Sequence, residues 1–285
     1  MKKRTYLTIP ALLAVSMAAN AQFVDLFTEA QSAADATNGD GAVTSSTSTG
    51  IASILGGQRD ISAEAISGAN DADGGGCNTI DDLCSVVSIN GGFLNFSNDT
   101  SGAGGVVGEG IVQWDGADQD IALDVDGLAS TDLTDGGLYN AFTYDVLFSD
   151  QGWEFELALY SDANNFTIVQ IEAIGTDEDG DGVHVPYSEE IFFANLENAA
   201  LCGLGSGVIE GIVSVTCGNA NTQPVDMSSL GAFQLTFNNA ADGRTSAVDF
   251  TIGPILTVPE PGPLGLMGMA MLIAGMARYR QHKKG

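Results

Sequence analysis

Cationic side chains are nearly absent from the central part of this 285-residue chain. Of its 9 lysine and arginine residues, only Arg59 and Arg244 lie between residues 22 and 257, and no lysine does. The same stretch holds all but one of the 37 acidic residues. Such a field repels phosphate backbones and anionic lipids, which excludes nucleic acid and anionic membranes as partners of this part. Calcium, cationic surfaces and neutral polymers stay compatible with it, as does a plain role of the carboxylates in solubility.

Groups for catalysis are also scarce. Residues 22–257 contain one histidine, His184, so Ser-His-Asp and Cys-His schemes depend on that residue alone, and Schiff-base schemes lack their lysine. Neither His-Glu-x-x-His nor a Gly-Lys-Ser/Thr phosphate loop is present. Two carboxylates suffice for glycoside hydrolysis, so a polysaccharide-acting enzyme remains an alternative. We expect a non-catalytic protein.

The amino terminus has the three parts of an export signal. Lys2, Lys3 and Arg4 precede a mainly apolar run over residues 7–18, and small residues follow it at positions 19 and 21. We therefore predict a signal helix over residues 1–21, with cleavage between Ala21 and Gln22. The mature domain then spans residues 22–257.

The last segment, residues 258–285, also has three parts. Pro259, Glu260 and Pro261 are followed by the apolar run Leu264–Ala277 and by a basic end. The basic residues of that end are Arg278, Arg280, Lys283 and Lys284. In this order the parts resemble the carboxy-terminal sorting segment of PEP-CTERM proteins. The resemblance implies processing by an exosortase-type membrane enzyme and a structural or adhesive role beside extracellular polysaccharide.

The apolar run is short for a membrane helix. Leu264–Ala277 is 14 residues long, whereas a full span needs about 20. The basic residues behind it are expected to stay cytoplasmic. This length fits a transient hydrophobic helix that holds the protein until the tail is removed. A permanent anchor is the alternative.

Short strand-like runs separated by polar turns dominate residues 22–257, which are enough for one large domain. Residues 153–160 alternate cleanly and residues 166–174 follow a polar turn, which predicts an antiparallel hairpin with one buried face. Residues 31–50 have little to bury, so we expect a loosely ordered entry segment. No long amphipathic helix interrupts the series, which favours an all-β, jelly-roll-like antiparallel β-sandwich. Further expected strands are 51–55, 86–89, 93–96, 108–114, 142–148, 208–216, 232–237 and 247–255.

Four cysteines lie in this exported region, where disulfides are expected. Local pairing, Cys77 with Cys84 and Cys202 with Cys217, is favoured among the three pairings because each couple brackets a short segment. Closing a loop of about 15 residues contributes about 3 kcal/mol in the chain-entropy model. A metal–thiolate site is the alternative, but no Cys-x-x-Cys supports it.

The sharpest candidate for chemistry is a calcium loop. Asp177, Asp179 and Asp181 stand at alternate positions and Gly182 permits the sharp turn that gathers their carboxylates. Position twelve is Ser188 rather than Glu, so a complete EF-hand is not expected. A solvated turn is the competing interpretation. The acidic runs 71–74 and 115–120 are weaker candidates because they lack a full set of ligands.

Sugar binding is the main active alternative, as a calcium-dependent carbohydrate-binding module. Exposed aromatic rings stack on sugar faces, and Trp114 precedes a polar turn, so it is the better of the two tryptophans for an exposed platform. Trp153 starts an alternating strand and is expected in the core. Arg59 is expected in a structural ion pair.

Overall fold

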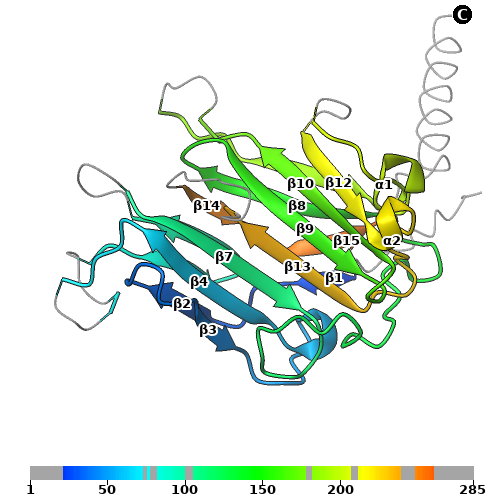
Figure 1. The fold of residues 1–285 in the computed structure, drawn as a ribbon, viewed down its shortest axis with the longest axis horizontal. Helices are drawn as coiled ribbons and strands as arrows, with labels where there is room; N and C mark the ends of the chain where they lie inside the picture. Colours follow the sequence, from blue (N-terminus) through cyan, green and yellow to red (C-terminus); the bar gives the residue numbers. More distant parts are fainter. Residues whose placement is uncertain are drawn as a thin grey trace, which may run out of the picture.

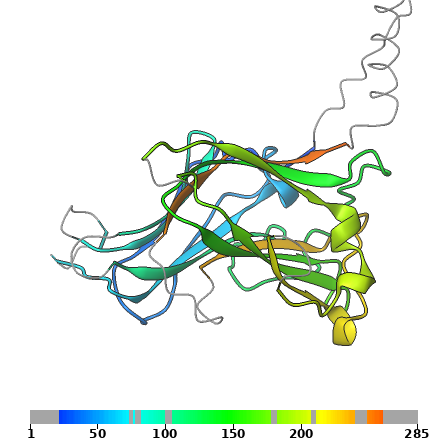
Figure 2. The same ribbon diagram turned by 90° about the horizontal axis from the view of Figure 1, so that it is seen from above.

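The computed structural model describes residues 22–72, 76–77, 82–99, 105–177, 182–206, 211–238 and 248–259. Over these residues the chain forms two antiparallel sheets packed face to face (Figures 1 and 2). The predicted all-β antiparallel sandwich is therefore confirmed. The predicted signal helix and hydrophobic tail helix lie outside the described residues.

The seven-stranded sheet contains the expected hairpin, next to its central strand β13. β9 and β10 pair in register from Tyr160↔Phe166 to Trp153↔Ala173. In order across the sheet, the strands are β12 (Ile212–Cys217), β10 (Phe166–Ala173), β9 (Trp153–Tyr160), β13 (Ala232–Phe237), β7 (Val107–Trp114), β4 (Asp60–Ser67) and β3 (Val43–Ser46).

The eight-stranded sheet joins both ends of the described chain, because β1 (Phe23–Asp25) pairs with β15 (Ile255–Val258). β8 (Ala141–Ser149) pairs with β15 and β14 on one edge and with β11 (Tyr187–Phe192) on the other. Beyond these lie β14 (Asp249–Ile252), β6 (Phe93–Asn98), β5 (Ser85–Asn90) and β2 (Gln31–Asp35). Some connections cross between the sheets, as from β7 to β8 and from β13 to β14, whereas β5–β6 and β9–β10 are hairpins within one sheet.

Helical structure is confined to short turns at the ends of strands within the described residues. α1 (Phe193–Leu196) follows β11 directly, and α2 (Gly218–Asn221) follows β12. Asn219 and Ala220 in α2 have left-handed backbone angles, so this element is a tight turn. Two 3₁₀ turns, η1 (Leu55–Gly57) and η2 (Ala199–Leu201), complete the set.

Aromatic side chains fill the space between the sheets. Trp153 stacks on Phe250 of the opposite sheet with ring centroids 4.0 Å apart, and Phe237 meets Phe250 edge-on at 4.8 Å. Trp153, Phe155, Leu157 and Leu159 all point into this core, as the alternation predicts. The core is therefore set by odd-numbered positions of β9, and the even-numbered positions face outward.

Several expectations for single elements are wrong. Residues 31–50 were expected to be loosely ordered, but they contain β2 and β3. Residues 51–55 form no strand beyond an isolated bridge at Ile54, and the 247–255 run breaks into β14 and β15 around Gly253 and Pro254. Proline lacks the N–H that a continuous ladder needs, which explains the break.

Candidate functional site

Three carboxylates converge at one end of the seven-stranded sheet. Asp60 is the first residue of β4, and Asp115 directly follows the last residue of β7. Because Asp60 pairs with Gln113, both carboxylates lie at the same end of this strand pair. Asp118 reaches them from the loop after β7. One carboxylate oxygen from each of the three residues lies within 4.8 Å of the other two. Asp60 and Asp115 are each 1% exposed, whereas Asp118 is exposed.

Strand alternation explains why these groups face away from the core. Ile61 and Trp114 point between the sheets and are fully buried there, with Trp114 against the Phe233 ring at 5.0 Å. Their neighbours Asp60, Gln113 and Asp115 therefore occupy the opposite, outer face of the sheet.

The loop 116–128 closes over this outer face. The Asp124 N–H donates to Asp115 Oδ2 at 2.8 Å, and the Leu128 N–H donates to the Gly231 carbonyl at 2.8 Å. The two ends of the loop also touch, since a Cβ on Gly116 would lie 2.5 Å from the Gly127 carbonyl oxygen. Gly116 has φ of +107°, which L side chains rarely adopt. The loop is thus a closed cover that presents Asp118 to Asp60 and Asp115.

Buried polar atoms without partners surround the three carboxylates. The Ser46 hydroxyl lies near Asp60, but no donor has hydrogen-bond geometry at either Asp60 oxygen or at Asp115 Oδ1. Gln113 donates from Nε2 to Asp115 Oδ2 at 2.5 Å, yet its own Oε1 is buried without a partner. Both amide atoms of Gln58, which is 0% exposed, are unpartnered as well. Buried polar groups are normally satisfied, so these acceptors are available to a ligand.

The surroundings of both buried acids, Asp60 and Asp115, destabilise their charged forms and raise their pKa values. The pKa of Asp60 is raised to about 6, mainly by burial; the Ser46 hydroxyl lowers it in part, and the charges of Asp115, Asp118 and Asp120 contribute to the rise. Burial is the largest cause that raises the pKa of Asp115 to about 6; the Asp124 N–H and the Gln113 amide oppose the rise, whereas the charges of Asp118 and Asp124 add to it. The site therefore favours protons or a cation.

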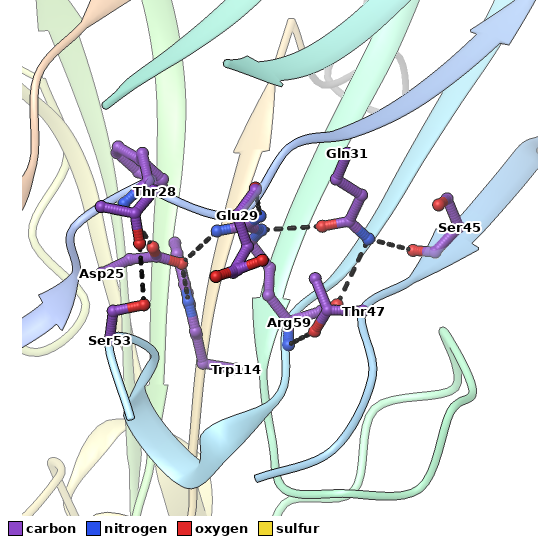
Figure 3. Close-up of polar contacts among 10 residues, drawn as sticks. Asp25, Thr28, Glu29, Gln31, Ser45, Thr47, Ser53, Arg59 and Trp114 are labelled. Carbon is purple, nitrogen blue, oxygen red and sulfur yellow. Dashed lines mark hydrogen bonds and ion pairs between the residues drawn. The ribbon is translucent and has the colours of Figure 1, made fainter. Parts of the chain in front are cut away.

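Arg59, although next to Asp60 in sequence, does not neutralise this cluster. Its side chain points to the opposite face, where Nη1 bonds Asp25 Oδ2 at 2.6 Å and Nε bonds Gln31 Oε1 at 2.8 Å (Figure 3). Nη2 donates to the Glu29 carbonyl at 2.8 Å. Arg59 and Asp25 are both 0% exposed. The expected structural ion pair of Arg59 is confirmed, and its partner is Asp25.

The prediction that Trp114 serves as an exposed sugar platform is wrong. Trp114 is 0% exposed, and its Nε1 donates to Asp25 Oδ2 at 2.8 Å (Figure 3). The residue precedes a polar turn, but it occupies an inward position of β7. Tyr139, Tyr144 and Trp153 are also buried, whereas Tyr160 and Tyr187 are partly exposed.

The other predicted sites have mixed outcomes. Both disulfides form as predicted, Cys77–Cys84 and Cys202–Cys217. In the predicted calcium loop, Asp177 accepts from the Gly182 N–H at 3.0 Å, while Asp179 and Asp181 lie outside the described residues. His184 contacts Thr176 Oγ1 through Nδ1 at 2.8 Å. Ala21, Glu260 and Pro261 lie outside the described residues, so signal cleavage before Gln22 and the sorting motif at Pro259 stay predictions.

Membrane-spanning structure is not found in the described part of the chain, where no helix is long and apolar enough to cross a bilayer. The predicted hydrophobic segment, Leu264–Ala277, is not among those residues.

Comparison with known proteins finds only distant structural similarity. No family model matches the sequence, and no curated protein matches it. Similar solved structures include PfGH50B, at 8% identity and a TM-score of 0.35, where the match covers 62% of this chain and 22% of that one. Another is the family 11 carbohydrate-binding module of the cellulosomal cellulase Lic26A-Cel5E of Clostridium thermocellum, at 11% identity and a TM-score of 0.32, with 84% and 94% covered. These TM-scores are too low for either likeness to carry an argument.

Proposed function

We propose that this chain is an exported, non-catalytic structural or adhesive component of a cell-surface or extracellular polymer layer. The observation that carries the proposal is the charge of the surface. Arg59 is the single lysine or arginine among the described residues, and it is completely buried. The described surface therefore presents carboxylates and neutral groups, with His184 as its one ionisable base. Such a surface suits a hydrated protein that works among neutral polymers and cations.

Export is supported by the two disulfides, which persist in oxidising compartments. The signal-like residues 1–21 and the PEP-CTERM-like residues 258–285 supply the route. In this proposal an exosortase-type enzyme processes the tail after transient membrane retention, and the acidic sandwich remains outside the cell.

The route is tested by fractionating the cells that make the protein and measuring the intact mass of the natural product. We expect a surface or extracellular chain that begins at Gln22 and lacks the tail residues after the Pro-Glu-Pro motif. A Pro259→Ala/Pro261→Ala variant should keep its tail and stay with the membrane fraction. A cytoplasmic product with both ends intact would refute the proposed route.

Carbohydrate binding is the second candidate, favoured by one aromatic pair. Tyr160 and Phe166 are cross-strand partners of β9 and β10, both partly exposed, with ring centroids 5.4 Å apart. Partly exposed rings on a sheet face are a platform on which sugar rings stack. A glycan array probed with the wild-type chain and with Tyr160→Ala, with and without calcium, distinguishes the candidates. Binding that Tyr160→Ala abolishes would favour this second function.

A further inference from the structure

The cluster of Asp60, Asp115 and Asp118 has no cationic partner within the described chain. The donors of Arg59 bond Asp25, Gln31 and the Glu29 carbonyl on the opposite face, and no other lysine or arginine is described. Placing three carboxylates within 4.8 Å of one another, two of them buried, is costly unless positive charge joins them.

The unpartnered atoms around the cluster have the chemistry of a ligand set. Gln113 is an uncharged residue whose side chain is 0% exposed. Its Nε2 donates to Asp115 Oδ2, which holds the amide at the cluster. Its Oε1 has no hydrogen-bond partner, nor does Asp115 Oδ1, and the two oxygens of Asp60 have only the nearby Ser46 hydroxyl. Gln58, two residues before Asp60, is also buried with both amide atoms unpartnered.

All these candidate ligand atoms are oxygens, and neither histidine nor cysteine belongs to the cluster. Zinc and copper prefer nitrogen and sulfur ligands, whereas calcium takes 6–8 oxygens from carboxylates, carbonyls and water. Magnesium usually retains most of its water and uses one or two carboxylates. Three carboxylates with one or two amide oxygens therefore match calcium best.

We propose that Asp60, Asp115 and Asp118, together with the amide oxygen of Gln113, form a calcium site. The ion would join the start of β4, the end of β7 and the loop 116–128. The Leu128 N–H donates to the Gly231 carbonyl, directly before β13. The ion would therefore also stabilise the contact of the loop with a third strand. This site is separate from the predicted loop at Asp177.

The test is a calcium titration of the full chain after chelation, by calorimetry and by thermal unfolding. At a calcium concentration 100 times the Kd, the melting temperature should rise by roughly 5–10 °C. Asp60→Asn and Asp118→Asn should each remove one bound calcium per chain, or weaken it at least tenfold. The matched control Asp40→Asn, which removes an exposed turn carboxylate, should bind calcium like the wild type.

Asp60→Asn also distinguishes ligation from a structural role. Because it removes an uncompensated buried charge, its melting temperature in chelator should equal or exceed that of the wild type, while its response to calcium falls. Asp177→Asn should leave this site intact. The proposal is overturned if millimolar calcium has no effect, if Asp60→Asn responds like the wild type, or if only Asp177→Asn loses the response.

Discussion

At the scale of single residues, adjacent positions of one strand have opposite surroundings. Arg59 points into the sandwich and donates to Asp25, Gln31 and the Glu29 carbonyl, whereas Asp60 points outward into a buried cluster of carboxylates. Alternation along the strand separates them, so neighbouring opposite charges in the sequence do not form a pair. Asp25, 34 residues away in sequence, takes the arginine instead.

Replacing Arg59 by methionine leaves Asp25 charged and buried without its partner. We expect the free energy of unfolding to fall by about 3–5 kcal/mol, measured by urea denaturation. The double variant Asp25→Asn/Arg59→Met should be less destabilised than Arg59→Met, because the unpaired charge is gone. Equal losses of stability in the two variants would show that the unpaired charge of Asp25 is not the cause of the destabilisation.

The pKa values of Asp60 and Asp115, about 6 rather than 3.8, predict how the chelated protein responds to pH. Below about pH 4 the folded and unfolded states both carry these protons, so the two acids contribute nothing. Between about pH 4 and 6 the unfolded chain releases them first, and the folded state is destabilised as pH rises. Above about pH 6 the loss is complete.

Asp60→Asn should remove its share of this loss. In chelator, the variant should gain stability relative to the wild type as pH rises from about 4 to about 7. Asp118, Asp120 and Asp124, whose charges face the two acids, remain unchanged in this comparison. A difference between variant and wild type that does not change with pH would contradict the assignment.

At the scale of elements, large alternating apolar residues made strands predictable. β9 and β13 lie at the residues expected for them because bulky side chains alternate or cluster there. β4 was missed because its alternation uses Asp, Ser, Ala and Glu, whose small or polar side chains give a weak strand pattern. Residues 31–50 were missed for the same reason, since their strands add little apolar surface of their own.

This missed strand is also why the sequence does not predict the cluster of Asp60, Asp115 and Asp118. The run 115–120 was visible, but Asp60 and Gln58 come from a segment more than 50 residues earlier. Only the pairing of β4 with β7 brings them to Asp115. The disulfides, in contrast, were predictable because each one closes a short local segment.

The disulfides should stabilise the fold unequally. Cys202 and Cys217 are separated by 15 residues, and Cys77 and Cys84 by 7. In the chain-entropy model the Cys202→Ser/Cys217→Ser variant loses about 3 kcal/mol and the Cys77→Ser/Cys84→Ser variant about 2 kcal/mol. Urea denaturation of both variants measures this order. The reverse order would indicate that local packing, rather than loop length, determines the effect.

At the scale of the whole molecule, the central part of the chain and its two end segments differ in charge. The basic residues lie almost entirely in the two end segments, and the described sandwich keeps its single arginine buried. Because the described surface has no lysine or exposed arginine, we expect it to bind neither nucleic acid nor anionic lipid. With calcium bound as proposed, cations occupy specific carboxylate sites, while the remaining surface keeps the protein hydrated among polymers.

The most direct test of the structural role is the cohesion of the extracellular layer. The gene is deleted from the cells that make the protein and restored either as the full chain or without residues 258–285. We predict that deletion weakens the layer without shortening its polysaccharides, and that only the full chain restores it. An unchanged layer after deletion, or polysaccharide chains that lengthen because a hydrolase is missing, would contradict a non-catalytic structural role.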